Sequence, residues 1–135
     1  MRLLLADTGP LYALTDRDDR HHFRARSELA RLSAAGWTLA SPLPVLCESY
    51  SLILKRLGSG PAIQWWRRSQ GGGLGLLNPT RDDYAAAATR VAGLGDQAVS
   101  LFDGLLAVLS ERLESPVWTF DHDFDLLRAE VWRAG

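Results

Sequence analysis

The fold is decided by a stretch near the start of the chain, LLLADTGP at residues 3–10. Its first four residues form a continuous apolar run, and the next four are residue types that end strands and form turns. A short apolar run of this kind predicts a buried strand. Asp7 then stands at the carboxyl end of that strand, where the turn begins.

Strands and helices alternate along the rest of the chain. Short apolar runs predict further strands at residues 37–40, 74–77 and 116–119, with a last short one around 130–132. Amphipathic spacing, capping residues and terminating glycines predict helices at residues 23–35, 45–57, 61–70, 82–94 and 100–113. In the first of these helices, Phe23 is assigned to the apolar face and Glu28 to the polar face. Strands separated by helices pair in parallel through right-handed crossovers. The sequence therefore predicts an α/β fold, a three-layer α/β/α sandwich with a central parallel sheet.

Composition indicates one soluble domain. The chain of 135 residues is 47% hydrophobic, which is enough for one core and too little for two ordinary domains, so we interpret residues 1–135 as a single domain. No apolar run approaches the roughly 20 residues that span a membrane. Cys47 is the only cysteine, which excludes a disulfide within the chain and favours a reducing compartment. We therefore expect a cytoplasmic protein without membrane contact.

The charge balance argues against a protein that coats polyanions in general. Fifteen basic residues stand against sixteen acidic ones, which gives a net charge of -1. A nuclease remains compatible with this balance, because it can gather its acids in one pocket while arginines elsewhere meet the phosphates. Lys55 is the only lysine of the chain, and the other fourteen basic residues are arginines.

Four acidic residues fall where the predicted sheet would bring them to one rim. Asp7 follows the first strand and Asp121 follows the fourth, so their carboxylates lie side by side if these strands are neighbours. Glu48 and Asp103 are expected in the first turns of apolar helices, near the same rim. Glu48 falls at the margin of the apolar stripe of its helix, on the same side as Lys55.

Converging carboxylates predict a metal ion. They repel one another and raise one another's pKa values, so an empty site would be destabilising at neutral pH. Because all the donors are oxygens and no cysteine takes part, Mg²⁺ or Mn²⁺ is the favoured ion. Such an ion activates water and stabilises charge on a phosphate, which predicts hydrolysis of a phosphodiester with one of the acids accepting a proton. The spacing does not identify that acid.

Each acid also has a purely structural interpretation. Residues 100–103 have the spacing of a helix capping box, and so do residues 80–83, to which we assign no chemistry. Asp7 could cap a short helix that starts at Pro10, and Asp121 could shape a turn. The acids therefore predict a site only when they are taken as a set.

Five motifs follow one another along the chain: DTGPL at residues 7–11, HH at 21–22 before an arginine-rich helix, Glu48 in a helix led by proline, LFDGLLA at 101–107 and TFDHDF at 119–124. Taken in this order, they resemble the motifs of PIN domains, and most of all those of VapC-type toxins of bacterial toxin-antitoxin pairs. The resemblance covers essentially the whole chain. Its specificity comes from the order and spacing of the motifs.

The resemblance implies a metal-dependent endoribonuclease that hydrolyses RNA with Mg²⁺ or Mn²⁺. It also implies the toxin of a VapBC-type pair, which forms a homodimer and is inhibited by a small antitoxin protein that masks the site. By position, Asp7 and Asp103 match the main metal ligands, and Glu48 and Asp121 match the remaining catalytic acids. Auxiliary positions are matched by Thr8, Thr119 and Asp123. The chain departs from the pattern at Gly104, where alanine is usual, and Asp125 competes with Asp123.

Two other functions compete with this hypothesis. A catalytically silent PIN-like module would bind RNA or a protein without cutting, but such a module is expected to lose acids. A phosphatase with Asp7 as nucleophile needs a second aspartate two residues later, where Gly9 stands. Of the other polar and aromatic residues, we expect exposed histidines at 21–22, core or interface packing for the tryptophans at 65–66, and a core position for Cys47.

Overall fold

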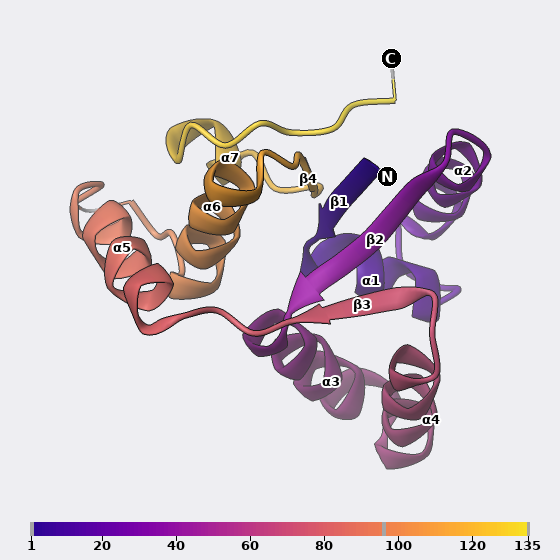
Figure 1. Cartoon of the computed structure of the whole chain (residues 1–135). Coiled ribbons are helices and arrows are strands. Elements are labelled where there is room, and N and C mark those ends of the chain that lie inside the picture. Colours follow the sequence, from indigo (N-terminus) through magenta and orange to yellow (C-terminus); the bar gives the residue numbers. More distant parts are fainter. Residues whose placement is uncertain (1, 96, 135) are drawn as a thin grey trace.

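A computed structural model describes residues 2–95 and 97–134 as strands and helices that alternate along the chain (Figure 1). The strands are β1 (Arg2–Ala6), β2 (Trp37–Pro42), β3 (Leu74–Leu77) and β4 (Val117–Trp118). The helices are α1 (Thr8–Thr15), α2 (His22–Ala34), α3 (Leu43–Leu57), α4 (Ser59–Gln70), α5 (Arg81–Ala92), α6 (Leu101–Leu113) and α7 (Asp123–Leu126). Among the helices of these ranges, none has both the length and the apolar character of a membrane span.

The strands form one parallel sheet in the order β3-β2-β1-β4. This confirms the predicted parallel sheet. It also meets the condition on which the approach of Asp7 to Asp121 depended, because the first strand lies beside the fourth. Ala6 of β1 pairs with Trp118 of β4, so the two strands end at the same level. Asp7 and Thr119, the next residue after each strand, are therefore brought to one edge of the sheet.

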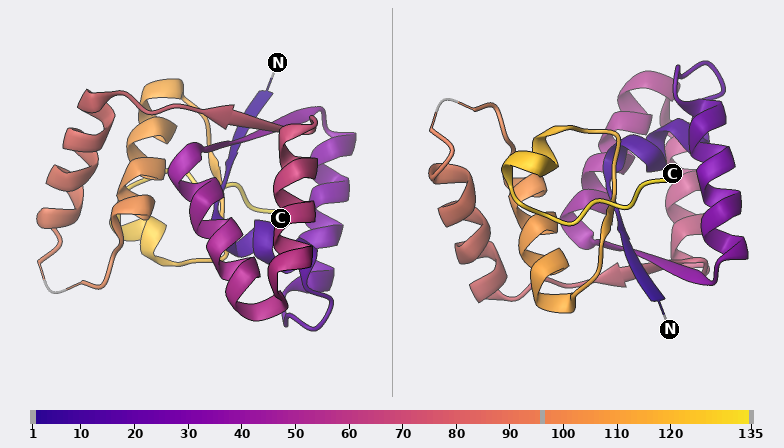
Figure 2. Two further views of the ribbon diagram at one scale, coloured as in Figure 1. Left: turned by 90° about the horizontal axis from the view of Figure 1, so that it is seen from below. Right: turned by 90° about the horizontal axis from the view of Figure 1, so that it is seen from above.

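Helices cover both faces of the sheet, as predicted. Figure 2 shows α5 and α6 on one side and α1, α2 and α4 on the other. Side chains of β1 alternate between the two layers: Leu5 packs with the core of α6, whereas Leu4 and Ala6 pack with the core of α1 and α2. Both faces of β1 are therefore buried, which explains its continuous apolar run.

The ends of several elements differ from the prediction. Strand β2 continues through Ser41 and Pro42, which were expected to precede the next helix. The buried Ser41 hydroxyl donates a hydrogen bond to the Ala6 carbonyl at 2.6 Å, which holds this extension against β1. The acidic loop after β4 contains the short helix α7, and the expected last strand is reduced to one bridge between Val117 and Val131.

The burial of several side chains was predicted wrongly. Cys47 is exposed, because Val45 and Leu46 take the core positions of its helical turn. His22 is buried, and its Nδ1 lies 2.7 Å from the Ala13 carbonyl oxygen, so a backbone partner satisfies the ring. Phe23, which was assigned to the apolar face of α2, is 80% exposed.

A buried carboxylate completes the core between α2 and the sheet. Glu28 was assigned to the polar face of α2, but only 8% of it is exposed. Its Oε1 accepts a hydrogen bond from the indole N–H of the buried Trp118 at 2.9 Å, and its Oε2 lies 3.0 Å from Arg24 Nε. The half-buried Trp65 and Trp66 pack against this same side of the core, as expected. Glu28 therefore serves the packing of β4 against α2.

Candidate active site

Asp7 is fixed at the carboxyl end of β1 by hydrogen bonds to both of its carboxylate oxygens. Oδ1 accepts from the Thr8 backbone N–H at 2.8 Å, which makes Asp7 the N-cap of α1, and Oδ2 accepts from the Thr119 hydroxyl at 2.8 Å. Only 6% of Asp7 is exposed. Burial raises the pKa of Asp7 to about 7 in spite of these hydrogen bonds, and the nearby carboxylates of Asp103 and Glu48 raise it further. A proton or a cation is therefore favoured beside Asp7 at neutral pH.

Glu48 reaches the same site from α3. Because α3 begins at Leu43, Glu48 lies in its second turn, where the sequence had suggested the first. The Thr8 hydroxyl donates to Glu48 Oε1 at 2.5 Å, and the buried Ser49 hydroxyl lies 3.2 Å from the Thr8 oxygen. Since the Thr8 backbone N–H also binds Asp7, one residue links the carboxylates of β1 and α3.

Asp103 belongs both to a capping box and to the acidic cluster. Its backbone N–H donates to the Ser100 hydroxyl at 3.1 Å, and its Oδ2 lies 3.4 Å from the Ser100 nitrogen. Burial raises the pKa of Asp103, and the carboxylates of Asp121 and Glu48 raise it further. The structural and the chemical interpretations of Asp103 are therefore compatible.

Asp121 and Asp123 lie in the loop that follows β4. The Asp121 backbone N–H donates to the Thr119 hydroxyl at 3.0 Å, and the Asp123 N–H donates to Asp121 Oδ1 at 2.9 Å. One carboxylate oxygen from each of Asp103, Asp121 and Asp123 lies within 4.8 Å of the other two. Asp125 instead lies 3.3 Å from Arg133, so the structure brings Asp123 rather than Asp125 to the cluster.

These acids share one cleft of about 710 Å³ at the carboxyl edge of the sheet. Asp7, Glu48, Asp103 and Asp121 all line it, and Thr8 forms part of its wall. Thr119 is buried behind Asp7, and Asp123 lies beside Asp121 without lining the cleft. The sequence therefore placed the four acids correctly at one rim.

Sequence reasoning missed most of the basic and aromatic lining of the cleft. Its further walls include Arg20, His21, Lys55, Arg56 and Phe120. Lys55 could have been found from its position on the Glu48 side of the helix. The loop before α2 gave no comparable signal, because the approach of His21 to Phe120, with ring centroids 5.1 Å apart, depends on the tertiary fold.

The chemistry of the donors fits a hard divalent cation. All of the clustered side chains offer carboxylate oxygens, the ligands that Mg²⁺ and Mn²⁺ prefer. Among the ion pairs of the described residues, none involves Asp7, Glu48, Asp103 or Asp121. The raised pKa values of Asp7 and Asp103 indicate negative charge without a cationic partner. A bound divalent ion would supply that partner.

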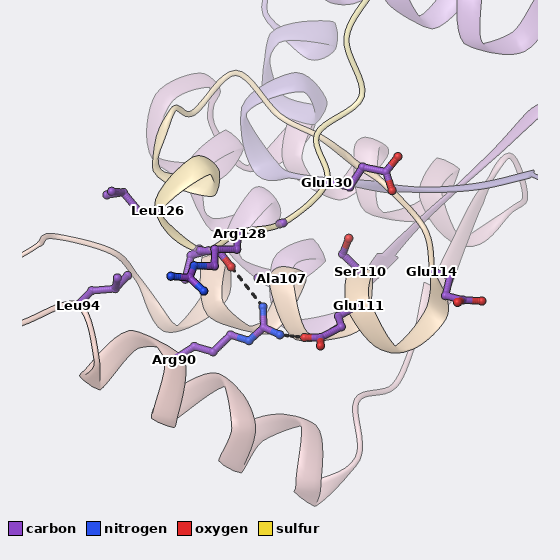
Figure 3. Close-up of a pocket in the computed structure, with 11 residues that line it drawn as sticks. Arg90, Leu94, Ala107, Ser110, Glu111, Glu114, Leu126, Arg128 and Glu130 are labelled. Carbon is purple, nitrogen blue, oxygen red and sulfur yellow. Dashed lines mark hydrogen bonds and ion pairs between the residues drawn. The ribbon is translucent and has the colours of Figure 1, made fainter.

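A second cavity, of about 760 Å³, lies elsewhere, between α5, α6 and the C-terminal segment (Figure 3). Arg90 crosses it, with one guanidinium nitrogen 3.3 Å from the Leu127 carbonyl oxygen and another paired with Glu111. The carboxylate of Glu111 thus already has a cation, and no residue of the acidic cluster lines the cavity. The cleft at Asp7 is therefore the better candidate for chemistry.

Fold and cleft together define an α/β protein with an acidic site at the carboxyl edge of a parallel sheet. The family model of the PIN domain matches residues 4–130, and the chain belongs to this family. None of the curated proteins matches the sequence significantly.

Two solved structures show the same fold. The chain is similar to VapC20 of Mycobacterium tuberculosis, described as a toxin that cleaves the sarcin-ricin loop, with a TM-score of 0.83 and 20% identity over 96% of this chain and 98% of that one. It is also similar to VapBC2 of Rickettsia felis, solved with a DNA fragment from its promoter, with a TM-score of 0.72 and 14% identity over 97% of both chains. At these identities the likeness concerns the fold.

Proposed function

We propose that this chain is a metal-dependent endoribonuclease and the toxin of a VapBC-type toxin-antitoxin pair. The observation that carries the proposal is the meeting of Asp7, Glu48, Asp103 and Asp121 in one cleft. Within residues 2–95 and 97–134, no basic side chain forms an ion pair with any of them. Membership of the PIN domain family and the fold shared with a toxin that cleaves RNA support the same conclusion.

In this proposal the four acids are the catalytic residues and hold Mg²⁺ or Mn²⁺, and Asp123 assists from beside Asp121. A bound ion would lower the pKa of a water molecule and stabilise negative charge on the phosphate. Thr8 keeps the Glu48 carboxylate beside Asp7, because its hydroxyl and its backbone N–H bind one carboxylate each. Hydrogen bonds from Thr8 thus hold the carboxylates of Asp7 and Glu48 in place before an ion binds.

Thr119 has a matching role on the other side of Asp7. Its hydroxyl donates to Asp7 Oδ2 and accepts the Asp121 backbone N–H, so it couples the end of β1 to the loop after β4. One of the cleft carboxylates accepts the proton of the attacking water. The phosphodiester enters this cleft, which Arg20 and Arg56 line together with the acids.

The proposed partners are RNA as substrate, a second copy of the chain in a homodimer, and a small antitoxin that covers the cleft. The pair would act in the cytoplasm, where its RNA substrates are. The VapBC2 likeness supports an antitoxin partner. Light scattering of the purified chain measures the dimer. Co-purification of the chain with a small protein that is co-expressed from the upstream gene measures the antitoxin complex.

Cleavage of RNA by the purified chain tests the proposal. We expect cleavage with Mg²⁺ or Mn²⁺ and none with EDTA or in Asp7→Asn. Asp83→Asn is the matched control, because Asp83 is a buried carboxylate that pairs with Arg112 and does not line the cleft. Cleavage that persists in EDTA or in Asp7→Asn would contradict the proposal. Binding of RNA without cleavage under any condition would favour the silent module instead.

A further inference from the structure

We propose that the ammonium group of Lys55 binds an RNA phosphate next to the one that is cleaved. The inference rests on the proposed function and names a residue that fixes the position of the strand. Lys55 lies on α3, is exposed, and lines the same cleft as the acids.

The geometry of α3 places Lys55 near the acidic residues of the cleft but not among them. Lys55 follows Glu48 by seven residues, which is two helical turns, so both side chains leave the same face of the helix. At about 1.5 Å per residue, the two positions are about 10 Å apart along the helix axis. A strand whose scissile phosphate lies at the acids therefore presents a neighbouring phosphate to Lys55.

Among the residues that the structure describes, Lys55 differs from the arginines of the cleft in forming no ion pair with an acidic side chain and no contact with another side chain of the cleft. Arg56 lies over the Tyr12 ring, 5.0 Å from its centroid, and Arg20 Nε donates to His21 Nε2 at 3.2 Å. The charge of Lys55 is thus available to a ligand.

The residue type suits this position. The planar guanidinium of arginine forms two parallel hydrogen bonds with carboxylates and phosphates alike. The ammonium of lysine is compact and strongly hydrated and acts as a point charge toward phosphate. In a chain with fourteen arginines, the only lysine stands at the border of the acids.

Steady-state cleavage of an RNA oligonucleotide with Mg²⁺ gives the first test. We expect Lys55→Gln to raise KM roughly 2- to 5-fold, the effect of one exposed ion pair, and to leave kcat unchanged. The dependence of log(1/KM) on log salt concentration should become shallower by about 0.7, the value for one phosphate contact on a single strand. In Lys55→Arg, KM should stay close to the wild-type value. Arg68→Gln, an exposed charge on α4 that does not line the cleft, is the control and should change neither quantity.

Chemical labelling gives a readout that is independent of catalysis. Because the chain has one lysine, an amine-reactive acetylating reagent modifies only Lys55 and the terminal amine, which mass spectrometry separates. We expect an RNA oligonucleotide to protect Lys55 and to leave the terminal amine reactive.

Four outcomes would overturn the inference. If the wild-type chain binds and cleaves RNA but Lys55 stays fully reactive, or if Lys55→Gln changes neither KM nor kcat, Lys55 does not bind the strand and the proposed function stands. If Lys55→Gln lowers kcat with KM unchanged, Lys55 acts on the reacting phosphate instead. If the wild-type chain neither binds nor cleaves RNA, the proposed function fails and the inference fails with it.

Discussion

Two helices of this protein begin with the same local motif and have opposite electrostatic environments. At the start of α5, the Asp83 backbone N–H donates to the Thr80 hydroxyl at 3.1 Å, and Asp83 Oδ2 accepts from the Thr80 N–H at 2.8 Å. At the start of α6, Ser100 and Asp103 form the same reciprocal pair, at 3.1 and 3.4 Å. In sequence and in local geometry, the two aspartates are equivalent.

Asp83 and Asp103 differ in the charged groups that surround them. Asp83 receives the Arg112 guanidinium at 2.9 and 2.8 Å, and this contact holds its pKa below the ordinary value. Burial raises the pKa of Asp103, and Asp121 and Glu48 add negative charge beside it. The comparison teaches that a capping box says nothing about chemistry. The charge that the tertiary fold brings to the free side of the carboxylate decides between a structural and a functional role.

The largest expected effect is the loss of activity in Asp103→Asn. If Asp103 is a metal ligand, its replacement should lower kcat/KM by at least about 100-fold, since even partners behind a ligand cost 10- to 100-fold. The free energy of unfolding without metal should stay equal or rise, because like-charge repulsion is removed. Cleavage assays and urea unfolding of the same preparation measure both. Retained activity would show that Asp103 is only a cap, like Asp83.

The next effect is a pH dependence of stability that comes from Asp7. Its pKa is raised from 3.8 to about 7, so the folded protein holds a proton that the unfolded chain releases between these values. The free energy of unfolding of the metal-free protein should therefore fall as the pH rises from 4 to 7, by roughly 3 kcal/mol.

Asp83 changes the free energy of unfolding in the opposite direction and over a different pH range. Because its folded pKa is lowered, its contribution to stability is complete above pH 4 and is lost as the pH falls further. Urea unfolding in EDTA across pH 2 to 8 separates the two windows. Asp7→Asn should flatten the slope between pH 4 and 7, and Mg²⁺ should restore stability to the wild-type chain at pH 7. An unchanged slope in Asp7→Asn would assign the dependence to another group.

A smaller effect is expected from Asp83→Asn. This substitution keeps the shape of the side chain and removes the charge that binds Arg112, so it should lower the free energy of unfolding by about 2 kcal/mol, the contribution of hydrogen bonds to a charged group. The cleavage rate should not change, because Asp83 is remote from the cleft. Loss of cleavage in a folded Asp83→Asn variant would mean that the two capping boxes are not functionally distinct.

The smallest effect concerns Gly104, at which α6 packs against α5. A Cβ at this position would lie 2.7 Å from Val91 Cγ2 and 3.0 Å from the Ala87 carbonyl oxygen, because α5 and α6 pack closely here. Alanine gains about 1 kcal/mol of helix propensity, but overpacking costs about 1 to 3 kcal/mol. Gly104→Ala should therefore lower the free energy of unfolding by about 1 kcal/mol, measured by urea unfolding. A more stable variant would show that α5 can move away without cost.

The contact with α5 also explains a departure from the family pattern. The sequence shows glycine at position 104, where alanine is usual in the family that the chain resembles. The structure gives the reason, since the backbone of α5 at Ala87 occupies the space of a side chain. Local propensity could not reveal this, because the two positions are 17 residues apart in the sequence and adjacent only after folding.

The sequence by itself determined the order of the four paired strands and the five longest helices, the parallel sheet and the rim at which the acids meet. These follow from short-range patterns: an apolar run that ends at Asp7, helical spacing around Glu48, and a capping box at Asp103. Their roles as catalytic residues stay a prediction until cleavage is measured. Burial at single positions was less predictable, and Cys47, His22 and Phe23 were misplaced.

Only the tertiary structure decided which charges face one another. It gave Asp83 the guanidinium of Arg112 and Asp103 the carboxylates of Asp121 and Glu48, and it left Lys55 without a partner among the described residues. The physical reason is the distance along the sequence over which each kind of interaction acts. Backbone patterns are fixed by neighbours within a few residues, whereas burial and Coulomb interactions depend on groups that only the folded chain brings together.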